Sequence, residues 1–351
     1  MTEMDGSDPA TPASVPLLLI GGSAGSLGPM VELVNSLPAD LRAAVLVCQH
    51  TGQEGRSHLP HILGRRARLP ASWAVDLEQL ESGRVYVAPP GRHLLVHGGL
   101  ARVNAGPRVN RHRPSLDVLF ASAAHAAGPA TTAVVLSGVL DDGAVGSAVV
   151  DLMGGQVWVQ DPAAAEFGSM PGAALAATPG ARIMSSTPVG RDIMASVERA
   201  SGRGPSRGRP LTPGVEEAME GQIDDTPGFL KPGESRLTRL ACPECGGGLA
   251  QVDLPQISYF RCHVGHQYGP QSLAAAQSEA VEQKLWSAVA AMEEQAVVQR
   301  YLDSDGLAEP PRAGTYRSSA PELANRAVAL REQVQRWTTD PDPDRSESEP
   351  T

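Results

Sequence analysis

The chain has few aromatic residues, few cysteines and no long hydrophobic run near its start. Phe, Trp and Tyr make up 4% of the 351 residues, so a hydrophobic core must rely on Ala, Val and Leu. The longest early apolar run, Val15 to Ile20, is interrupted by Pro16 and is far too short to cross a membrane. The first 14 residues lack the basic start and apolar stretch of a secretory signal. We therefore expect a cytoplasmic protein without membrane insertion.

An excess of basic residues is also missing. Lys and Arg total 29 against 39 Asp and Glu, which gives a net charge of −10. This balance favours solubility and disfavours nucleic-acid binding, but it does not identify a partner. Gly (37 residues) and Pro (30 residues) are plentiful, which indicates many turns and at least one linker.

Short apolar strands that do not alternate with polar residues recur between helical segments. Such strands are buried on both faces, so the pattern predicts an α/β fold with a mainly parallel, doubly wound sheet and crossover helices. A β-hairpin is expected around His97-Gly98-Gly99. The predicted strands are Leu17–Ile20, Ala44–Cys48, Val85–Ala88, Thr132–Leu136 and Gln156–Gln160, and helices are expected from about Gly28, at Pro114–Phe120 and at Ala144–Met153.

Composition changes along the chain predict its domain boundaries. A stretch rich in Gly, Pro and Ser reads as a linker, and a polar acidic end reads as a disordered tail. The predicted parts are 1–14 (disordered N-terminus), 15–200 (α/β domain), 201–236 (linker), 237–270 (small zinc-knuckle-like Cys/His module), 271–340 (C-terminal helices) and 341–351 (tail).

A serine lies in a glycine-rich turn directly after the first strand. The segment Gly21-Gly22-Ser23-Ala24-Gly25 fits the pattern G-x-S-x-G, in which flanking glycines permit a sharp turn and let a substrate carbonyl approach the hydroxyl. The alternatives are a plain Gly-rich turn or a phosphate cradle, although the G-K-[ST] of a P-loop is missing. Ser23 is therefore a candidate nucleophile.

A histidine and two aspartates follow other strands of the same predicted sheet. His50 follows the second strand, and Asp141 and Asp142 follow the strand that ends near Leu136. The imidazole is a suitable base for a serine hydroxyl, and a carboxylate accepting the His50 Nδ1–H would hold its tautomer. A surface histidine and a helix N-cap aspartate are the alternatives. Because parallel strands end at one edge, we expect these side chains to converge.

At this point residues 15 to about 195 resemble the catalytic domain of CheB-type chemotaxis methylesterases. The resemblance implies Ser23 as nucleophile, His50 as base and Asp142 as its orienting carboxylate, with an oxyanion hole at the amides of Ala24 and Val139. The matching segments are Ile20–Gly25, Gln49–His50, Val85–Pro90, Arg113–Phe120, Val135–Gly146, Gln160–Pro162 and Met170–Pro171.

The resemblance implies hydrolysis of glutamate γ-methyl esters on a methylated chemoreceptor or receptor-like protein, with release of methanol and no catalytic cofactor. Some family members also deamidate glutamine. The usual N-terminal receiver domain does not precede residue 15, so control by a phosphorylated aspartate within this chain is not expected.

Two positions depart from the family pattern. The family usually has Gly where this chain has Ser26, and the loop before the catalytic aspartate commonly ends in Gly where this chain has Leu140. These departures leave open the alternative of a catalytically weak scaffold that binds a receptor or a methyltransferase. A serine esterase of other substrates that uses the same triad is a further alternative. The sequence leaves the oligomeric state open.

The C-terminal third contains a Cys/His cluster. Cys242-x₂-Cys245 is followed by Cys262-x₃-His266, two short-spaced pairs of soft ligands that suit tetrahedral zinc. A redox Cys-x-x-Cys pair or incidental cysteines are the alternatives. The spacing therefore predicts a structural zinc ion that stabilises a module with little core of its own.

Overall fold

The computed structural model describes residues 15–50, 58–65, 67–184, 190–201, 235–304 and 319–339. The predicted N-terminal and acidic tails, and residues 202–234 of the predicted linker, lie outside the described residues. The chain divides into two compact units, residues 1–273 and 274–351. Within the described ranges, no helix combines the length and the hydropathy that crossing a bilayer requires.

Seven parallel strands form the central sheet of the first unit, in the order β10-β9-β8-β1-β2-β5-β3. All residues of β1 are buried, as expected for a strand covered on both faces. The predicted parallel α/β sheet is therefore confirmed. Its strands are β1 (Leu17–Gly22), β2 (Ala44–Gln49), β3 (Ala71–Trp73), β5 (Val85–Val87), β8 (Thr131–Val135), β9 (Gln156–Gln160) and β10 (Arg182–Met184).

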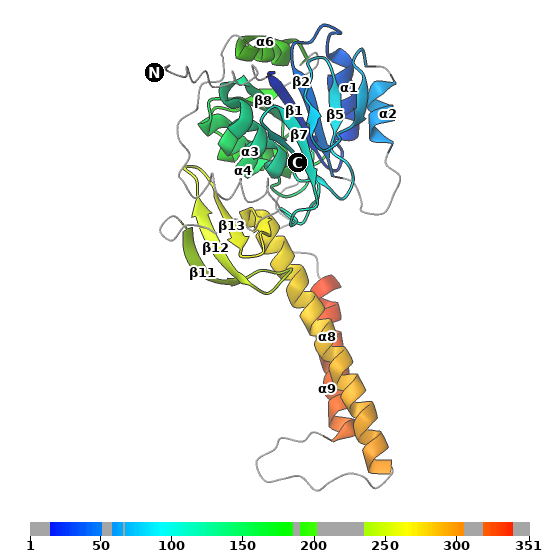
Figure 1. Ribbon diagram of the computed structural model, residues 1–351. Helices are drawn as coiled ribbons and strands as arrows, with labels where there is room; N and C mark the ends of the chain where they lie inside the picture. The colour runs from blue at the N-terminus through cyan, green and yellow to red at the C-terminus, as the bar shows by residue number, and fades with distance from the viewer. Residues whose placement is uncertain are drawn as a thin grey trace, which may run out of the picture. The chain divides into compact units, whose positions relative to one another are not determined.

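Helices cover both faces of this sheet (Figure 1). On one face, Leu17 and Leu19 of β1 pack against α3 (Leu116–Ala127), α4 (Ala144–Leu152) and α5 (Ser169–Ala177). A short 3₁₀ helix at Gly128–Ala130 follows α3. Leu18 and Ile20 pack in the opposite cluster with α1 (Leu27–Ser36), α2 (Leu59–Gly64) and α6 (Gly190–Ser201). Successive side chains of β1 thus point to opposite faces of the sheet, and both faces are buried, which explains the unbroken apolar run.

The predicted hairpin is present beside the main sheet. β6 (His93–His97) and β7 (Leu100–Asn104) pair in antiparallel fashion across Gly98 and Gly99, both at positive φ. β4 (Glu78–Gln79) adds a third strand to this small sheet.

The Cys/His region is built of β-strands. It forms a four-stranded antiparallel sheet of β11 (Ser235–Ala241), β12 (Gly248–Asp253), β13 (Ser258–Cys262) and β14 (Gln267–Tyr268). Val252, Leu254 and Tyr259 join the same buried cluster as α3 and α4. The module therefore shares a core with the α/β sheet.

Two helices follow, as predicted. α8 (Pro270–Ser304) begins in the first unit, and most of its length lies in the second unit with α9 (Ala320–Thr339). The buried side chains recur at helical spacing, and an ion pair joins Arg331 to Glu293. The buried residues of the second unit include Ala276, Val289, Ala296, Leu323, Ala327 and Val334.

Candidate active site

Three neighbouring strands bring the predicted catalytic residues to one edge of the sheet. Ser23 follows β1 directly, His50 follows β2, and Asp142 lies beyond β8. The Ser23 amide donates to the Ser137 carbonyl at 2.9 Å, and the His50 amide donates to Gly22 at 3.1 Å. β1 is flanked by β2 on one side and β8 on the other, so the residues meet where the strand order reverses, the usual ligand position in such sheets.

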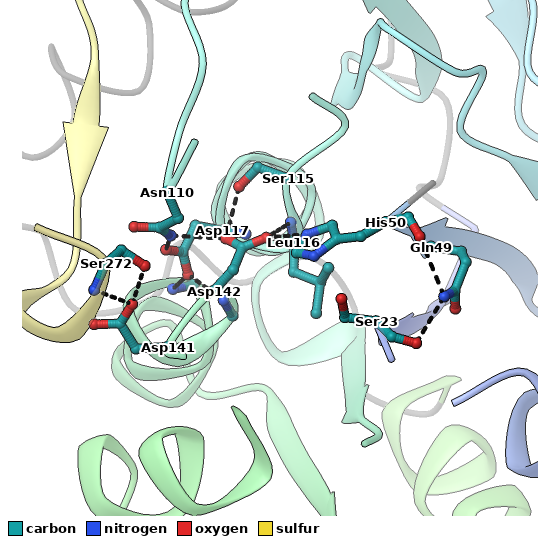
Figure 2. Close-up of polar contacts among 12 residues, drawn as sticks. Ser23, Gln49, His50, Asn110, Ser115, Leu116, Asp117, Asp141, Asp142 and Ser272 are labelled. Atoms are coloured by element: carbon teal, nitrogen blue, oxygen red, sulfur yellow. Dashed lines mark hydrogen bonds and ion pairs between the residues drawn. The ribbon is translucent and has the colours of Figure 1, made fainter. Parts of the chain in front are cut away.

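His50 and Asp142 form a close pair. His50 Nε2 lies 2.7 Å from Asp142 Oδ2, and the two side chains are 5% and 2% exposed. The prediction that Nδ1 would face the carboxylate is wrong, because the ring is turned so that Nε2 does. His50 Nδ1 is buried and has no hydrogen-bond partner among the described residues. Figure 2 shows Ser23 on the His50 side of the site, with no hydrogen bond yet joining it to the imidazole.

Asp142 is fixed by the beginning of α3 as well as by His50. Its carboxylate accepts hydrogen bonds from the Leu116 amide (2.7 Å), the Ser115 hydroxyl (2.7 Å) and Asn110 Nδ2 (2.8 Å). Burial alone raises the pKa of Asp142, but the hydrogen bond and charge of His50, with further donors, outweigh it and lower this pKa. Asp142 is therefore an anion that fixes the orientation of the imidazole.

Asp117 is a second buried carboxyl beside Asp142. It accepts the amides of Gly143 (3.0 Å) and Gly146 (2.7 Å) at the beginning of α4. Burial, followed by the charge of Asp142, raises the pKa of Asp117 well above its ordinary value. Asn110 Nδ2 also donates to Asp117 at 2.6 Å, so one amide group joins the two carboxyls. The site thus favours one anion, and the geometry assigns it to Asp142.

Asp141 has a different contact from its neighbour. Its carboxylate accepts the backbone amides of Gln271 (2.7 Å) and Ser272 (3.0 Å) and lies against the Ser272 hydroxyl (Figure 2). Asp141 therefore caps the beginning of α8, while Asp142 caps α3. Each aspartate therefore caps a helix, and Asp142 also pairs with His50.

Gln49 and Ser26 fix the turn that carries the candidate nucleophile. Gln49 Nε2 donates to the Ser23 carbonyl oxygen at 2.8 Å. The buried Ser26 hydroxyl lies 2.6 Å from both that oxygen and Gln49 Oε1. Sequence reasoning did not assign a role to Gln49, although its place next to His50 in the matching segment was the available signal. The departure at Ser26 is accommodated by this hydrogen-bond network.

The proposed oxyanion donors are the amides of Ala24 and Val139. Both residues are exposed, and neither amide has an acceptor within the described part of the chain. Gly138, which precedes Val139, has no room for a side chain, since a Cβ there would lie 2.9 Å from Ser23 Cβ. Leu140 closes this loop with φ of 66°, a left-handed conformation that glycine adopts without strain.

The sequence assigned no role to His112. Its ring stacks on His50, with centroids 3.7 Å apart and planes inclined by 10°. Burial, followed by the neighbouring His50, lowers the pKa of His112 to about 4. The stacked ring is therefore neutral at neutral pH and covers one face of the imidazole.

The four predicted metal ligands lie together in the module. The ligand atoms of Cys242, Cys245, Cys262 and His266 are all within 4.8 Å of one another. His266 Nδ1 is 3.7 Å from Cys242 Sγ and 3.6 Å from Cys262 Sγ. Tetrahedral zinc with Zn–S of about 2.3 Å requires ligand separations of about 3.5–3.8 Å, and these two distances match it. His266 Nε2 lies 3.3 Å from Glu244, a carboxylate of the kind that orients metal-bound histidines.

Comparisons with known proteins give one family. A family model described as CheB methylesterase matches residues 18–193. A relative from Leptospira interrogans is 36% identical over 162 residues, which are 46% of this chain and 84% of the relative. A protein-glutamate methylesterase/protein-glutamine glutaminase 2 of Anaeromyxobacter dehalogenans is 37% identical over 161 residues, or 46% of this chain and 47% of the relative.

The chain therefore spans about half the length of the Anaeromyxobacter relative. Among solved structures, the catalytic domain of Thermotoga maritima CheB methylesterase aligns with a TM-score of 0.48 and 25% identity, covering 53% of this chain and 99% of that one.

Proposed function

Because the chain belongs to the CheB methylesterase family, we propose that it hydrolyses glutamate γ-methyl esters on a chemoreceptor-like protein and releases methanol. The observation that carries this proposal is the buried His50–Asp142 pair at 2.7 Å, adjacent to Ser23 at the edge of the sheet. The names of the relatives also support deamidation of receptor glutamines by the same site.

Acylation begins with Ser23 Oγ attacking the ester carbonyl. His50 accepts the hydroxyl proton through Nδ1, while Nε2–H stays bonded to Asp142 and stabilises the imidazolium. The amides of Ala24 and Val139 would stabilise the oxyanion of the tetrahedral intermediate. The C–O bond to the leaving group then breaks, and methanol departs with the proton from His50. This step requires a side-chain movement that joins Ser23 Oγ to His50 Nδ1, which has no partner in the described chain.

Deacylation repeats the same steps with water. His50 takes a proton from water, the hydroxide attacks the glutamyl ester of Ser23, and the serine leaves with that proton. The products are the receptor glutamate and free enzyme, and no cofactor takes part. For a glutamine substrate the first leaving group is ammonia.

The test is methanol release from a methylated receptor by the 351-residue chain. The wild-type protein is expected to release methanol, and Ser23→Ala is expected to lower kcat by more than about 10³-fold. Ser36→Ala, at an exposed serine in α1, serves as the matched control and should behave like wild type. Equal methanol release by wild type and Ser23→Ala would contradict a mechanism with Ser23 as the nucleophile.

The strained loop at Leu140 supports a second candidate function. A loop altered in this way would suit a weakly catalytic scaffold that binds a receptor or a methyltransferase. Receptor binding without methanol release would favour this candidate. Hydrolysis of small esters but not of methylated receptor would instead favour an esterase of other substrates.

We also propose that Cys242, Cys245, Cys262 and His266 hold a structural zinc ion. Four protein ligands leave no open position for substrate, so the ion would stabilise the module and take no part in hydrolysis. Because thiolate ligands require reduced cysteines, we assign the protein to the cytoplasm. One bound zinc per chain is expected, with loss in Cys242→Ser and Cys262→Ser. Cys48→Ala, in β2, is the control, and unchanged zinc in the two ligand variants would reject the site.

A further inference from the structure

The Cys/His module touches the catalytic domain at the segment that follows its last metal ligand. His266 is followed directly by β14, and the Asn110 amide donates to the Gln267 carbonyl at 2.7 Å. The Gln267 amide donates to the Arg108 carbonyl at 3.3 Å. The loop before α3 therefore pairs with β14 and connects the module to the active-site edge.

The Asn110 side chain continues this contact to Asp142. Its Oδ1 accepts the Gly269 amide at 2.7 Å, while its Nδ2 donates to Asp142 at 2.8 Å and to Asp117 at 2.6 Å. The residue is fully buried. One amide group thus bonds the module with its oxygen and the anion of the site with its nitrogen.

Asp141 supplies a second contact, one residue before Asp142. It caps α8 through the amides of Gln271 and Ser272, at 2.7 and 3.0 Å. Its carboxylate approaches Gly269 so closely that a Cβ there would lie 2.4 Å from Oδ2. Asn110, Asp141 and residues 267–272 together form what we call the latch.

The latch and the ligand cluster are one continuous piece of structure. Tyr268, inside the latch, has its hydroxyl 3.6 Å from Cys242 Sγ and 3.0 Å from Glu244. Val252 and Tyr259 anchor the same module in the core cluster of α3. The ligand cluster is therefore in contact, through Tyr268, with the segment that bonds to Asn110 and Asp141.

We propose that the Cys/His module positions the Asp142 carboxylate through this latch, with Asn110 and Asp141 as positioning residues. The inference rests on the proposed esterase function and deepens it. Loss of the metal frees residues 267–272, and Asn110 then loses the partner that fixes its amide. Asp142 and the His50 ring become less ordered, which lowers kcat more than KM because the latch acts through Asp142 on the chemical step.

The first experiment cuts the latch without changing a triad residue. In the zinc-loaded 351-residue chain, Asp141→Ala is expected to lower kcat for methanol release about 10-fold and to change KM less than about 3-fold. Asp141→Asn keeps an acceptor oxygen for α8 and should restore most of the rate. Asp76→Ala is the matched control, since Asp76 also accepts a backbone amide, that of Val103, outside the latch. Wild-type kcat in Asp141→Ala would overturn the proposal.

The second experiment is a thermodynamic cycle that combines zinc removal with the substitution Asn110→Ala. Chelation of zinc is expected to lower wild-type kcat about 10-fold, but to lower that of Asn110→Ala by less than about 3-fold, since the link is already cut. Equal losses in both proteins, or no loss in wild type, would overturn the proposal. A wild-type protein that releases no methanol would instead refute the proposed function.

Hydrogen exchange gives a readout that does not depend on activity. Removing zinc should speed exchange in the peptide covering residues 105–117, which contains Asn110 and the beginning of α3. The peptide covering α1 (residues 27–36) is the internal control. Unchanged exchange at residues 105–117 on metal loss would overturn the latch, including in a variant too unstable for kinetics.

Discussion

At the scale of single residues, Leu140 occupies a backbone conformation that suits a residue without a side chain. Its φ of 66° is left-handed, and only a few non-glycine residues of the described chain share this property. The left-handed conformation costs an L-residue about 1–2 kcal/mol. The loop next to Ser23 therefore stores strain at the position where the family commonly has glycine.

Replacing this residue should relieve the strain. Leu140→Gly is expected to raise the free energy of unfolding by about 0.5–1 kcal/mol, after the extra entropy that glycine gains in the unfolded chain. The measurement is urea unfolding. Leu77→Gly is the matched control, because Leu77 is exposed and has φ of 64°. Comparable stabilisation of both is expected, with methanol release altered in Leu140→Gly alone. A destabilised Leu140→Gly would show that side-chain packing outweighs backbone strain.

At the scale of elements, strand order explains what the sequence could predict. Ser23, His50 and Asp142 follow three apolar strands, and parallel pairing alone brings strand ends to one edge. Asn110 and His112 come from the connection between β7 and α3, where no periodicity sets the backbone. Their contacts with Asp142 and His50 could not be read from the pattern.

The nitrogen of His50 was predicted incorrectly for a related reason. Ring orientation depends on where the carboxylate oxygens point, and the beginning of α3 fixes them through the Leu116 amide and the Ser115 hydroxyl. Which helix each aspartate caps is likewise a property of the folded chain, because α8 lies far from Asp141 in the sequence. The dipeptide Asp141-Asp142 could not reveal this division.

The double contact of Asp142 makes its amide variant informative. Asp142→Asn keeps the shape and one acceptor oxygen, but its NH₂ group must replace either Oδ2, which accepts from His50 and the Leu116 amide, or Oδ1, which accepts from Ser115 and Asn110. We expect kcat for methanol release to fall by about 10³–10⁴-fold, with the fold retained, because the imidazole loses its tautomer control. Near-UV circular dichroism checks the fold, and Asp76→Asn is the control. A kcat within tenfold of wild type would contradict the assigned role.

At the scale of the whole molecule, the Cys/His module and the α/β sheet form a single compact unit. Sequence composition predicted a separate module at 237–270, since a stretch rich in Gly, Pro and Ser precedes it. The module nevertheless contributes Val252, Leu254 and Tyr259 to the catalytic core cluster. The free energy of unfolding of this unit should therefore depend on buried groups in both the sheet and the module.

Two buried histidines make this unit sensitive to acid. Burial is the main cause that lowers the pKa of His93 and of His112 to about 4 in the folded state, against 6.5 for the free side chain. The unfolded chain binds these protons first, so stability is lost as pH falls from about 6.5 to about 4 and not further below. Each histidine contributes a loss of up to about 3 kcal/mol.

The expected result is a lower free energy of urea unfolding at pH 4.5 than at pH 7. Carboxyl groups also contribute to the change in the free energy of unfolding with pH. The raised pKa of Asp117 acts in the opposite sense to the lowered pKa of Asp142. Comparison with His112→Phe isolates one contribution, since phenylalanine preserves the stack on His50 but binds no proton. The variant should lose less stability than wild type over this range, whereas His97→Gln, at an exposed hairpin position, should match wild type. Identical pH profiles for wild type and His112→Phe would mean that the stacked ring titrates equally in both states.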